Sequence, residues 1–482
     1  MERKEITRRE FLAATFAFGG CRLFAAPLGW NPDKKPNLVM GILSDTHMMT
    51  DRFGVKMHSM YSDRYFVPAL EYFRDANVDA VVHLGDLSNV GQVDAIKCHA
   101  DAWHRVFPGD RGVDGRQVAR LFITGNHDLD TQISEQRRKE FYPDEAERAK
   151  HTFANAAAAH WRNIWGEEYS DVWHRAIKGY HFFAWQWGFD ETKAARFVLD
   201  HVESCGLSGE KPFFCLSHKR PYAPFRKALR PYGNAVAFFG HLHLSATNWN
   251  TIYMYDESVE TFPSIQCPPC TAPDWSLPLG KDDFKMNVPV EGIDAVGKGR
   301  QGFVVRVYDD MMVIERREFS KGGSLGADWV MPFRKYAPHP FTKGELKKAI
   351  GNPQFPDGAR LSVKECVASI ATGDAANADS DKRKMKKVPA VKVAIPHANG
   401  NPDSRVYVYD VVVVGEDPGK KIRKAVYAVG CNMGIGHEPC KGVTALFIPK
   451  DELPVGGKLT FAVRPLTSLG TYGKPIAAEL KV

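Results

Sequence analysis

The chain has 482 residues, of which 44% are hydrophobic and 25% are charged, as in a soluble globular protein. This length is too great for one ordinary core, so we expect two or three domains. The formal net charge of +7 is modest for the length and does not indicate a nucleic-acid partner. Nine cysteines are too few for a disulfide framework and too scattered for a zinc ribbon.

Residues 1–27 are expected to form an export signal. Phe11–Gly20 is an apolar run that is too short to span a bilayer as a helix of the mature chain. The run Thr7–Leu12 places two arginines before this stretch and resembles a twin-arginine export signal, the alternative being an ordinary basic leader. We therefore expect a bacterial protein that is exported to the periplasm or cell surface. Lipid anchoring at Cys21 is a further alternative.

Short apolar runs of strand length recur through the first half of the chain. They are Leu38–Leu43, Ala80–Leu84, Val118–Ile123, Phe213–Leu216 and Ala235–Phe239. Amphipathic stretches that read as helices, such as Tyr65–Arg74 and Thr192–Glu203, lie between several of them. This alternation of strands and helices predicts an α/β core with buried sheets.

The remaining segments suggest how the domains are divided. We assign residues 36–320 to the α/β domain, with a helical insertion at about 130–175. Residues 321–387 read as an irregular connecting region. In residues 388–482, β-rich segments at short spacing are separated by Gly, Pro, Asn and Asp, which is typical of a β-sandwich. Bracing the first domain is the expected role of this sandwich.

Polar motifs follow each of the five apolar runs. They are Asp45-Thr46-His47, Gly85-Asp86, Gly125-Asn126-His127-Asp128, His218 and Gly240-His241-Leu242-His243. Ligands of open α/β sheets gather at the carboxyl ends of strands, so these side chains could surround one point. The two Asp/His-x-His alternations fit extended backbone, in which residues two apart share a side, and the glycines permit tight turns.

These motifs supply carboxylate, imidazole and amide ligands but no thiolate. That set suits divalent Mn, Fe, Zn, Co or Ni. Seven ligands exceed the need of one tetrahedral ion and are enough for two ions that share a carboxylate.

The complete ordered set of motifs, spread over Asp45–His243, resembles the calcineurin-like metallophosphoesterases. The resemblance implies a two-sheet β-sandwich flanked by helices, and hydrolysis of a phosphomonoester or phosphodiester by a hydroxide that bridges two metals. It implies a first metal held by Asp45, His47, Asp86 and His243. It implies a second metal held by Asp86, Asn126, His218 and His241.

The same resemblance implies roles for two further residues. His127 would donate a proton to the leaving oxygen, and Asp128 would orient His127 by a hydrogen bond. Asn89 stands where the iron-containing purple acid phosphatases of this superfamily carry a tyrosine, so we expect no purple colour. Apart from this position in the motif, Asn89 is interpreted as a loop residue. His83 is interpreted as a core histidine with satisfied hydrogen bonds.

Four residues are candidates for contacting the substrate, which would be a small-molecule or cell-envelope phosphate ester. Trp161 and Arg162 lie in the insertion, and they could equally pack within it. Lys219 and Arg220 follow His218 and could bind a second phosphate or acidic group, or form a solvated loop. The competing function is a cell-surface or glycan-binding protein with a vestigial metal site, but the intact ligand set argues against it. Cys267-Pro-Pro-Cys270 reads as a structural loop rather than a redox motif.

Overall fold

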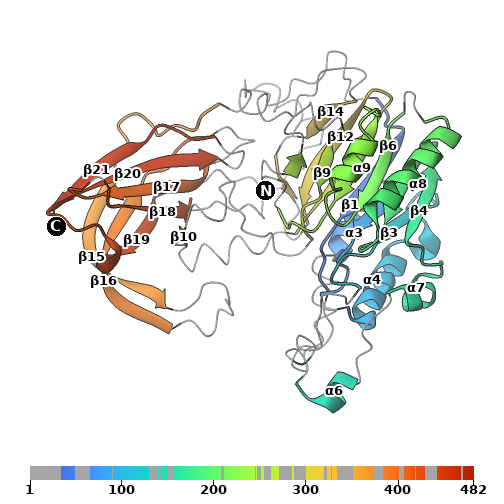
Figure 1. Cartoon of the computed structure of the whole chain (residues 1–482), viewed down its shortest axis with the longest axis horizontal. Helices are drawn as coiled ribbons and strands as arrows, with labels where there is room; N and C mark the ends of the chain where they lie inside the picture. The colour runs from blue at the N-terminus through green and yellow to red at the C-terminus, as the bar shows by residue number, and fades with distance from the viewer. Residues whose placement is uncertain are drawn as a thin grey trace, which may run out of the picture.

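A computed structural model gives the positions of most of the chain (Figure 1). It describes residues 34–48, 66–89, 91–129, 139, 143–149, 157–207, 211–244, 246, 251–253, 262–270, 285–286, 300–319, 323–326, 328–333, 351–372, 384–400, 406–417, 419–428, 442–467 and 471–481. The expected export signal, including Cys21, lies outside these residues. None of the described helices has the length and hydrophobicity that a bilayer crossing requires.

The first sheet has seven strands in the order β13-β12-β11-β1-β2-β3, with β14 paired to β12. Its strands are β1 (Leu38–Leu43), β2 (Ala80–Leu84), β3 (Ala119–Ile123), β11 (Gln301–Val307), β12 (Met311–Glu318), β13 (Gly323–Ser324) and β14 (Trp329–Pro332). The first three strands are parallel, whereas β11 runs antiparallel to β1. The carboxyl ends of β1, β2 and β3 therefore lie along one edge.

The second sheet has six strands in the order β4-β5-β6-β7-β9-β8. They are β4 (Val172–Ile177), β5 (Tyr180–Trp185), β6 (Phe213–Ser217), β7 (Ala235–Phe239), β8 (Ile252–Tyr253) and β9 (Ser264–Gln266). From β5 to β9 the neighbours are parallel.

The two sheets face each other across one apolar core. Ile42 and Val305 of the first sheet share this core with Phe182 and Phe238 of the second, and all four are fully buried. Burying one such side chain stabilises the fold by about 1.5–3 kcal/mol. Strands that are covered on both faces explain why the sequence shows continuous apolar runs rather than alternation.

Helices cover the outer faces of this sandwich (Figure 1). The described helices of the region are α3 (Val67–Asp75), α4 (Val93–Val106), η2 (Pro108–Asp110), α6 (Glu145–Ala149), α7 (Ala157–Trp165), α8 (Glu191–Ser204) and α9 (Ala223–Ala228). Side chains of α3, α4 and α7 pack on the first sheet, and side chains of α8 and α9 pack on the second. Helix α8 begins where the Asp190 carboxylate accepts a hydrogen bond from the Lys193 N–H at 2.8 Å. The predicted two-sheet sandwich flanked by helices is confirmed.

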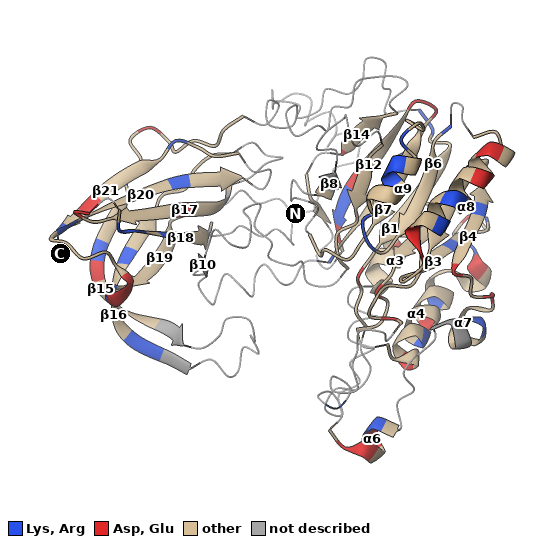
Figure 2. Cartoon of the chain, viewed as in Figure 1, with Lys and Arg blue, Asp and Glu red and all other residues tan. Residues whose placement is uncertain are grey.

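The C-terminal part contains two more sheets, in the orders β10-β18-β17-β20-β21 and β15-β16-β19. Their elements are β10 (Lys285–Met286), β15 (Ser362–Thr372), β16 (Lys384–Ile395), β17 (Val406–Val414), β18 (Lys421–Tyr427), β19 (Thr444–Pro449), η5 (Lys450–Glu452), β20 (Lys458–Thr467) and β21 (Ile476–Lys481). Val393, Val411 and Phe461 belong to one buried core that joins both sheets, which confirms the predicted all-β architecture. Figure 2 shows acidic and basic residues interspersed over both regions, in keeping with the modest net charge.

The structure differs from the sequence prediction at the segment boundaries. The first sheet continues past residue 320 through β13 and β14. The expected irregular region 321–387 contains the long strand β15 and the start of β16, which pair along their length. Charged residues on their outward faces hide these strands in the sequence. Within the expected helical insertion, β4 occupies the last residues, and much of the segment lies outside the described residues.

Candidate metal centre

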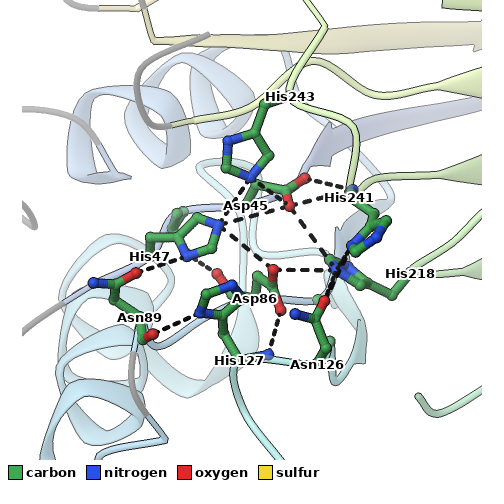
Figure 3. Close-up of polar contacts among 12 residues, drawn as sticks. Asp45, His47, Asp86, Asn89, Asn126, His127, His218, His241 and His243 are labelled. Carbon is green, nitrogen blue, oxygen red and sulfur yellow. Dashed lines mark hydrogen bonds and ion pairs between the residues drawn. The ribbon is translucent and has the colours of Figure 1, made fainter. Parts of the chain in front are cut away.

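The seven predicted metal ligands converge at one edge of the sandwich (Figure 3). They come from the segments that follow β1, β2, β3, β6 and β7, as the positions of the motifs predicted. Backbone hydrogen bonds join the first two segments, because Asp45 N–H donates to the Gly85 carbonyl at 3.0 Å and His47 N–H donates to the Asp86 carbonyl at 2.9 Å. These two hydrogen bonds therefore hold together the segments that follow β1 and β2.

One group of potential ligands consists of Asp45, His47, Asp86 and His243. The Nε2 atoms of His47 and His243 are 2.9 Å apart, and His243 Nε2 is 3.1 Å from Asp45 Oδ1. His47 Nε2 is also 3.5 Å from Asp86 Oδ2. Asp45 and Asp86 are 0% and 1% exposed, so water cannot solvate their charges.

A second group contains Asp86, His218 and His241. His218 Nε2 lies 3.1 Å from Asp86 Oδ2 and 3.1 Å from Asn126 Oδ1, and His241 Nδ1 lies 3.0 Å from the same amide oxygen. Asp86 belongs to both groups and is placed to bridge them, as expected. The two groups contain six of the seven residues in the ligand sets that the resemblance implied, and Asn126 contacts both histidines of the second group.

The donor chemistry of these groups fits metal ions. The Nδ1–H of His218 donates to the Leu84 carbonyl at 2.7 Å, and the Nδ1–H of His47 donates to Asn89 Oδ1 at 3.2 Å. Each ring therefore turns its Nε2 towards carboxylate oxygens. Nitrogen and carboxylate oxygen atoms this close require a proton or a metal cation among them.

The pKa shifts point to the same need for positive charge. Burial opposes protonation of His218, but the neighbouring Asp86 carboxylate outweighs it and raises the pKa to about 9. Burial lowers the pKa of His47 and that of His241 to about 4 each. Burial would raise the pKa of Asp86, but nearby His218 and His47 lower it to about 2. Two carboxylates therefore face one protonated imidazole, and the remaining negative charge could be offset by a divalent metal, which would displace the His218 proton on binding.

The backbone of the ligand loops corrects one expectation. Asp45, His47, Asp86, His241 and His243 have φ angles of 52°, 45°, 54°, 73° and 51°, in the left-handed region rather than extended. The prediction of extended backbone at the two alternating motifs is therefore wrong. A non-glycine residue in this region costs on the order of 1–2 kcal/mol, so packing and hydrogen bonds must hold these loops.

Two glycines are required by close approach rather than by turn geometry. A Cβ on Gly125 would lie 2.1 Å from Asp86 Oδ1, and a Cβ on Gly240 would lie 1.9 Å from Ser44 Oγ and 2.7 Å from Asp45 Oδ2. Only hydrogen fits at either position beside a ligand carboxylate.

His127 lies beside the first group of ligands, with its ring 4.6 Å from that of His47 and nearly perpendicular to it. Its Nδ1–H donates to the Asn89 carbonyl at 2.6 Å, which leaves Nε2 as the ring atom able to meet a substrate. Its backbone N–H donates to Asp86 Oδ1 at 2.9 Å. Asn89 thus orients His127 through its carbonyl and His47 through its side chain.

Asp128 does not play the part that was expected of it. Its carboxylate accepts hydrogen bonds from the backbone N–H groups of Leu87, Ser88 and Gly125 at 3.1, 2.7 and 2.9 Å, and the partner of the His127 ring is Asn89. Asp128 therefore joins the loops that follow β2 and β3. Burial and the nearby Asp86 carboxylate raise its pKa to about 7.

An aromatic and cationic wall, formed by Trp187, Lys219 and Tyr222, stands beside the second ligand group. The Trp187 ring is 5.6 Å from that of His218 and 5.3 Å from that of His241. Lys219 Nζ lies 5.3 Å from the centre of the Trp187 ring and 3.8 Å from that of Tyr222, which is 51% exposed. Arg220 follows in the same loop and is half-buried.

The insertion residues predicted to contact substrate lie elsewhere. Trp161 is 3% exposed and packs against Trp165 and Tyr169, so that prediction is wrong. Arg162 forms an exposed ion pair with Glu168 at 2.6 Å, and its role in substrate binding stays a prediction. Cys267 and Cys270 are buried and free, and the Cys270 N–H donates to the Ser44 carbonyl at 2.8 Å, in keeping with a structural loop.

Sequence reasoning missed the roles of Asn89 and Trp187. Asn89 follows Asp86 by three residues, a spacing that placed it near the site without revealing its two hydrogen-bonding roles. Trp187 lies two residues after β5, which is parallel to β6 and β7, and its place at the end of the apolar run Phe182–Trp185 was the signal that could have identified it.

A family of known proteins matches the segment that carries the ligands. Residues 38–245 match the sequence model of a family described as calcineurin-like phosphoesterase. A search of curated proteins found no match. Among solved structures, the chain is similar to a dimetal phosphatase from Danio rerio, with 13% identity, a TM-score of 0.33, and coverage of 62% of this chain and 100% of that one.

Two other solved structures are similar over about the same share of the chain. Purple acid phosphatase PPD1 from yellow lupin seeds has 13% identity and a TM-score of 0.41, covering 66% of this chain and 57% of that one. The 5'-nucleotidase precursor from Thermus thermophilus has 16% identity and a TM-score of 0.24, covering 65% of this chain and 57% of that one.

Proposed function

Because residues 38–245 belong to the calcineurin-like phosphoesterase family, we propose that this chain hydrolyses phosphate esters at a centre that holds two divalent metal ions. The observation that carries the proposal is the convergence of two ligand groups that share Asp86. Each ligand of the expected set is present and turned towards a common centre, which disfavours a vestigial site (Figure 3).

The ligands divide between the two positions according to the contacts described above. Asp45, His47, Asp86 and His243 would hold one ion. Asp86, His218, His241 and the amide oxygen of Asn126 would hold the other. Bound there, the ions would activate water and stabilise negative charge on the phosphoryl group.

His127 is proposed to supply the proton that the leaving oxygen needs. Its Nδ1–H is held by the Asn89 carbonyl at 2.6 Å, so the ring orientation is fixed. Nε2 is then the atom that can hydrogen-bond to the leaving group and transfer a proton to it. Asp128 supports this residue indirectly, because it fixes the backbone at Gly125.

Lys219 is proposed to bind a second anionic group of the substrate. Its ammonium is held against the Trp187 and Tyr222 rings, next to the second ligand group. A cation held against aromatic faces beside the centre would attract a distal phosphate or carboxylate. A Lys219→Gln variant should raise KM for such substrates about tenfold, which corresponds to about 1.4 kcal/mol of binding free energy. Its KM for nitrophenyl phosphate should stay within about twofold of the wild-type value.

The reaction is tested with nitrophenyl phosphate and bis-nitrophenyl phosphate, after chelation and after addition of Mn or Zn. We expect two metal ions per chain, and turnover that chelation abolishes and metal restores. Asp86→Asn and His127→Ala should each lower turnover by at least about 100-fold. Asp200→Asn, at an exposed position of α8, is the matched control and should leave turnover unchanged. A chain that binds no metal, or that turns over fully under chelation, would refute the proposal.

We further propose that residues 1–27 direct export through a twin-arginine route. The support is the sequence alone, namely Arg8-Arg9 before a short apolar run. Changing both arginines to lysine should leave the protein in the cytoplasmic fraction. Unchanged export in that variant would indicate an ordinary leader instead.

A further inference from the structure

Thr46 lies between two metal ligands in the chain, but its hydroxyl contacts two histidines of the interior. Thr46 Oγ1 is 2.8 Å from His99 Nε2, on α4, and 3.1 Å from His83 Nε2, on β2. Both histidines are 0% exposed, and Thr46 is 5% exposed. Neither histidine belongs to the ligand groups, and neither has a role in the proposed reaction.

The surroundings assign every proton in this cluster. The Ala95 carbonyl accepts from His99 Nδ1–H at 3.0 Å, so in the neutral ring Nε2 carries a lone pair and must accept the Thr46 hydroxyl proton. The threonine oxygen then accepts from His83 Nε2–H. His83 Nδ1 is left as an acceptor, and it faces the Gly85 backbone N–H at 3.3 Å.

The result is a hydrogen-bonded chain in which each group donates to the next. It runs from the Gly85 N–H through His83, Thr46 and His99 to the Ala95 carbonyl. Burial lowers the pKa of His99 to about 4 and that of His83 well below its usual value, so both rings are neutral, as the hydrogen-bonded chain requires. Phe66 packs on His99 with ring centres 4.6 Å apart, which excludes water from that side. Competing acceptors for the hydroxyl, the Asp86 and Leu87 carbonyls, are more distant at 3.3 Å.

This hydrogen-bonded chain acts on a strained part of the metal centre. Asp45 and His47 have positive φ angles, and Thr46 joins them with a side chain directed into the interior. Such a turn persists only where its surroundings fix it. The hydroxyl is the one polar side-chain group of the turn that faces away from the metal position, and it is held by β2 and α4.

We propose that Thr46, His83 and His99 position the Asp45–His47 turn and thereby set the affinity of the first metal position. The inference rests on the proposed function, because it assumes that this position holds a divalent metal. The three are positioning residues that act through Asp45 and His47, and they do not meet the substrate.

The test compares Thr46→Val, which keeps the shape but removes the hydroxyl, with Thr46→Ser, which keeps it. Calorimetric titration of metal-free protein with Mn should show affinity for one ion weakened about 10–100-fold in Thr46→Val, the usual effect of removing a partner that orients a ligand. Thr46→Ser should bind within about threefold of the wild type. Wild-type affinity in Thr46→Val, or equal losses in both variants, would overturn the proposal, the latter by showing that packing alone matters.

Nitrogen-15 NMR of the histidine rings provides a second readout that needs neither activity nor metal. The hydrogen-bonded chain requires the Nε2–H tautomer for His83 and the Nδ1–H tautomer for His99 in the wild type. Thr46→Val should change the His83 signals, because its Nε2–H loses its acceptor. The opposite wild-type tautomers would overturn the assignment even if Thr46→Val failed to fold. A wild-type protein that binds neither Mn nor Zn would instead refute the proposed function, and the tautomers would still decide the hydrogen-bonded chain.

Discussion

Buried carboxylates occur in both regions of the molecule, but the two regions neutralise them differently. In the C-terminal sheets, Asp410 is 0% exposed and accepts hydrogen bonds from Arg423 at 2.9 and 3.0 Å and from Arg464 at 2.7 Å. In the two-sheet sandwich, Asp45 and Asp86 are equally buried, and His218 is the neighbouring imidazole whose pKa is raised, to about 9. The first carboxylate is neutralised by arginines of the chain, whereas the two carboxylates of the second group carry more negative charge than one protonated imidazole offsets.

Backbone strain follows the same division. Among the described residues, all non-glycine residues with positive φ precede Leu244, and five of them are proposed metal ligands. The C-terminal sheets have an aliphatic core and no such residue within their described parts. Backbone strain and buried carboxylates therefore coincide where chemistry is proposed, and metal binding would compensate for both.

Metal removal should distinguish the two regions most strongly. For ions present at about 1,000 times their Kd, chelation should lower the free energy of unfolding of the first region by about 4 kcal/mol per ion. Hydrogen-exchange mass spectrometry would follow β1–β3 and β17–β20 separately. We expect faster exchange in the first set only. Equal changes in both sets would contradict the comparison.

Acidification should have the next largest effect. Burial lowers the pKa of His99 to about 4, below its value in the unfolded chain, so its stabilising contribution is present above about pH 6.5 and is lost as the pH falls towards 4. The contribution is about 3 kcal/mol. His47 acts in the same direction, whereas Asp128, whose pKa is raised to about 7, acts in the opposite direction, so the difference between the wild type and a His99 variant isolates the contribution of His99. Urea unfolding of metal-free protein at pH 6.5 and 4.5 would measure it. A His99→Gln variant should show a smaller pH dependence, and an unchanged slope would contradict the assignment.

Gly125→Ala should damage the metal centre without affecting the C-terminal sheets. The added Cβ would lie 2.1 Å from Asp86 Oδ1, so the bridging carboxylate must move. We expect turnover to fall about 100-fold, equivalent to about 2.7 kcal/mol, with weaker metal binding. Gly112→Ala is the control, because its nearest neighbour would be 3.5 Å away. Normal turnover in Gly125→Ala would show that the loop can shift freely.

Asp410→Asn should have the smallest effect, and it should affect the C-terminal sheets rather than the metal centre. Losing charge-assisted hydrogen bonds to two arginines should destabilise the C-terminal sheets by about 2 kcal/mol. Because the arginine side chains are 35% and 39% exposed, water can partly solvate them in the variant. Turnover and metal content should stay within about twofold of the wild type. A large loss of turnover would show that the C-terminal sheets contribute to catalysis.

The sequence predicted the strands of the sandwich well because buried parallel strands are continuous apolar runs. Leu38–Leu43, Ala80–Leu84 and Ala235–Phe239 were expected at the bounds that the structure shows. Strand β15 was missed because it carries Lys364, Glu365 and other polar residues on an exposed edge strand, where apolar patterning is weak.

The metal ligands were predictable because their types and order follow strand ends, but their supports were not. The Asn89 hydrogen bonds and the chain through Thr46 depend on contacts between segments that are far apart in sequence. Asp128 was assigned the wrong partner for the same reason, since its hydrogen-bond donors are set by where two loops meet. The left-handed backbone at His47 has no signal in residue type.

The pairing of β10 with β18 has a practical consequence for dissecting this protein. Residues 285–286 precede β11 of the first sheet, yet they add a parallel strand to the edge of the C-terminal sheet. A fragment that begins at residue 388 would therefore expose the edge of β18, and it would also lack β15, which pairs with β16. Unpaired edges recruit other chains and promote aggregation. Glycan-binding or folding experiments on the C-terminal sheets should accordingly begin before residue 362 and supply residues 285–286 in cis or as a peptide.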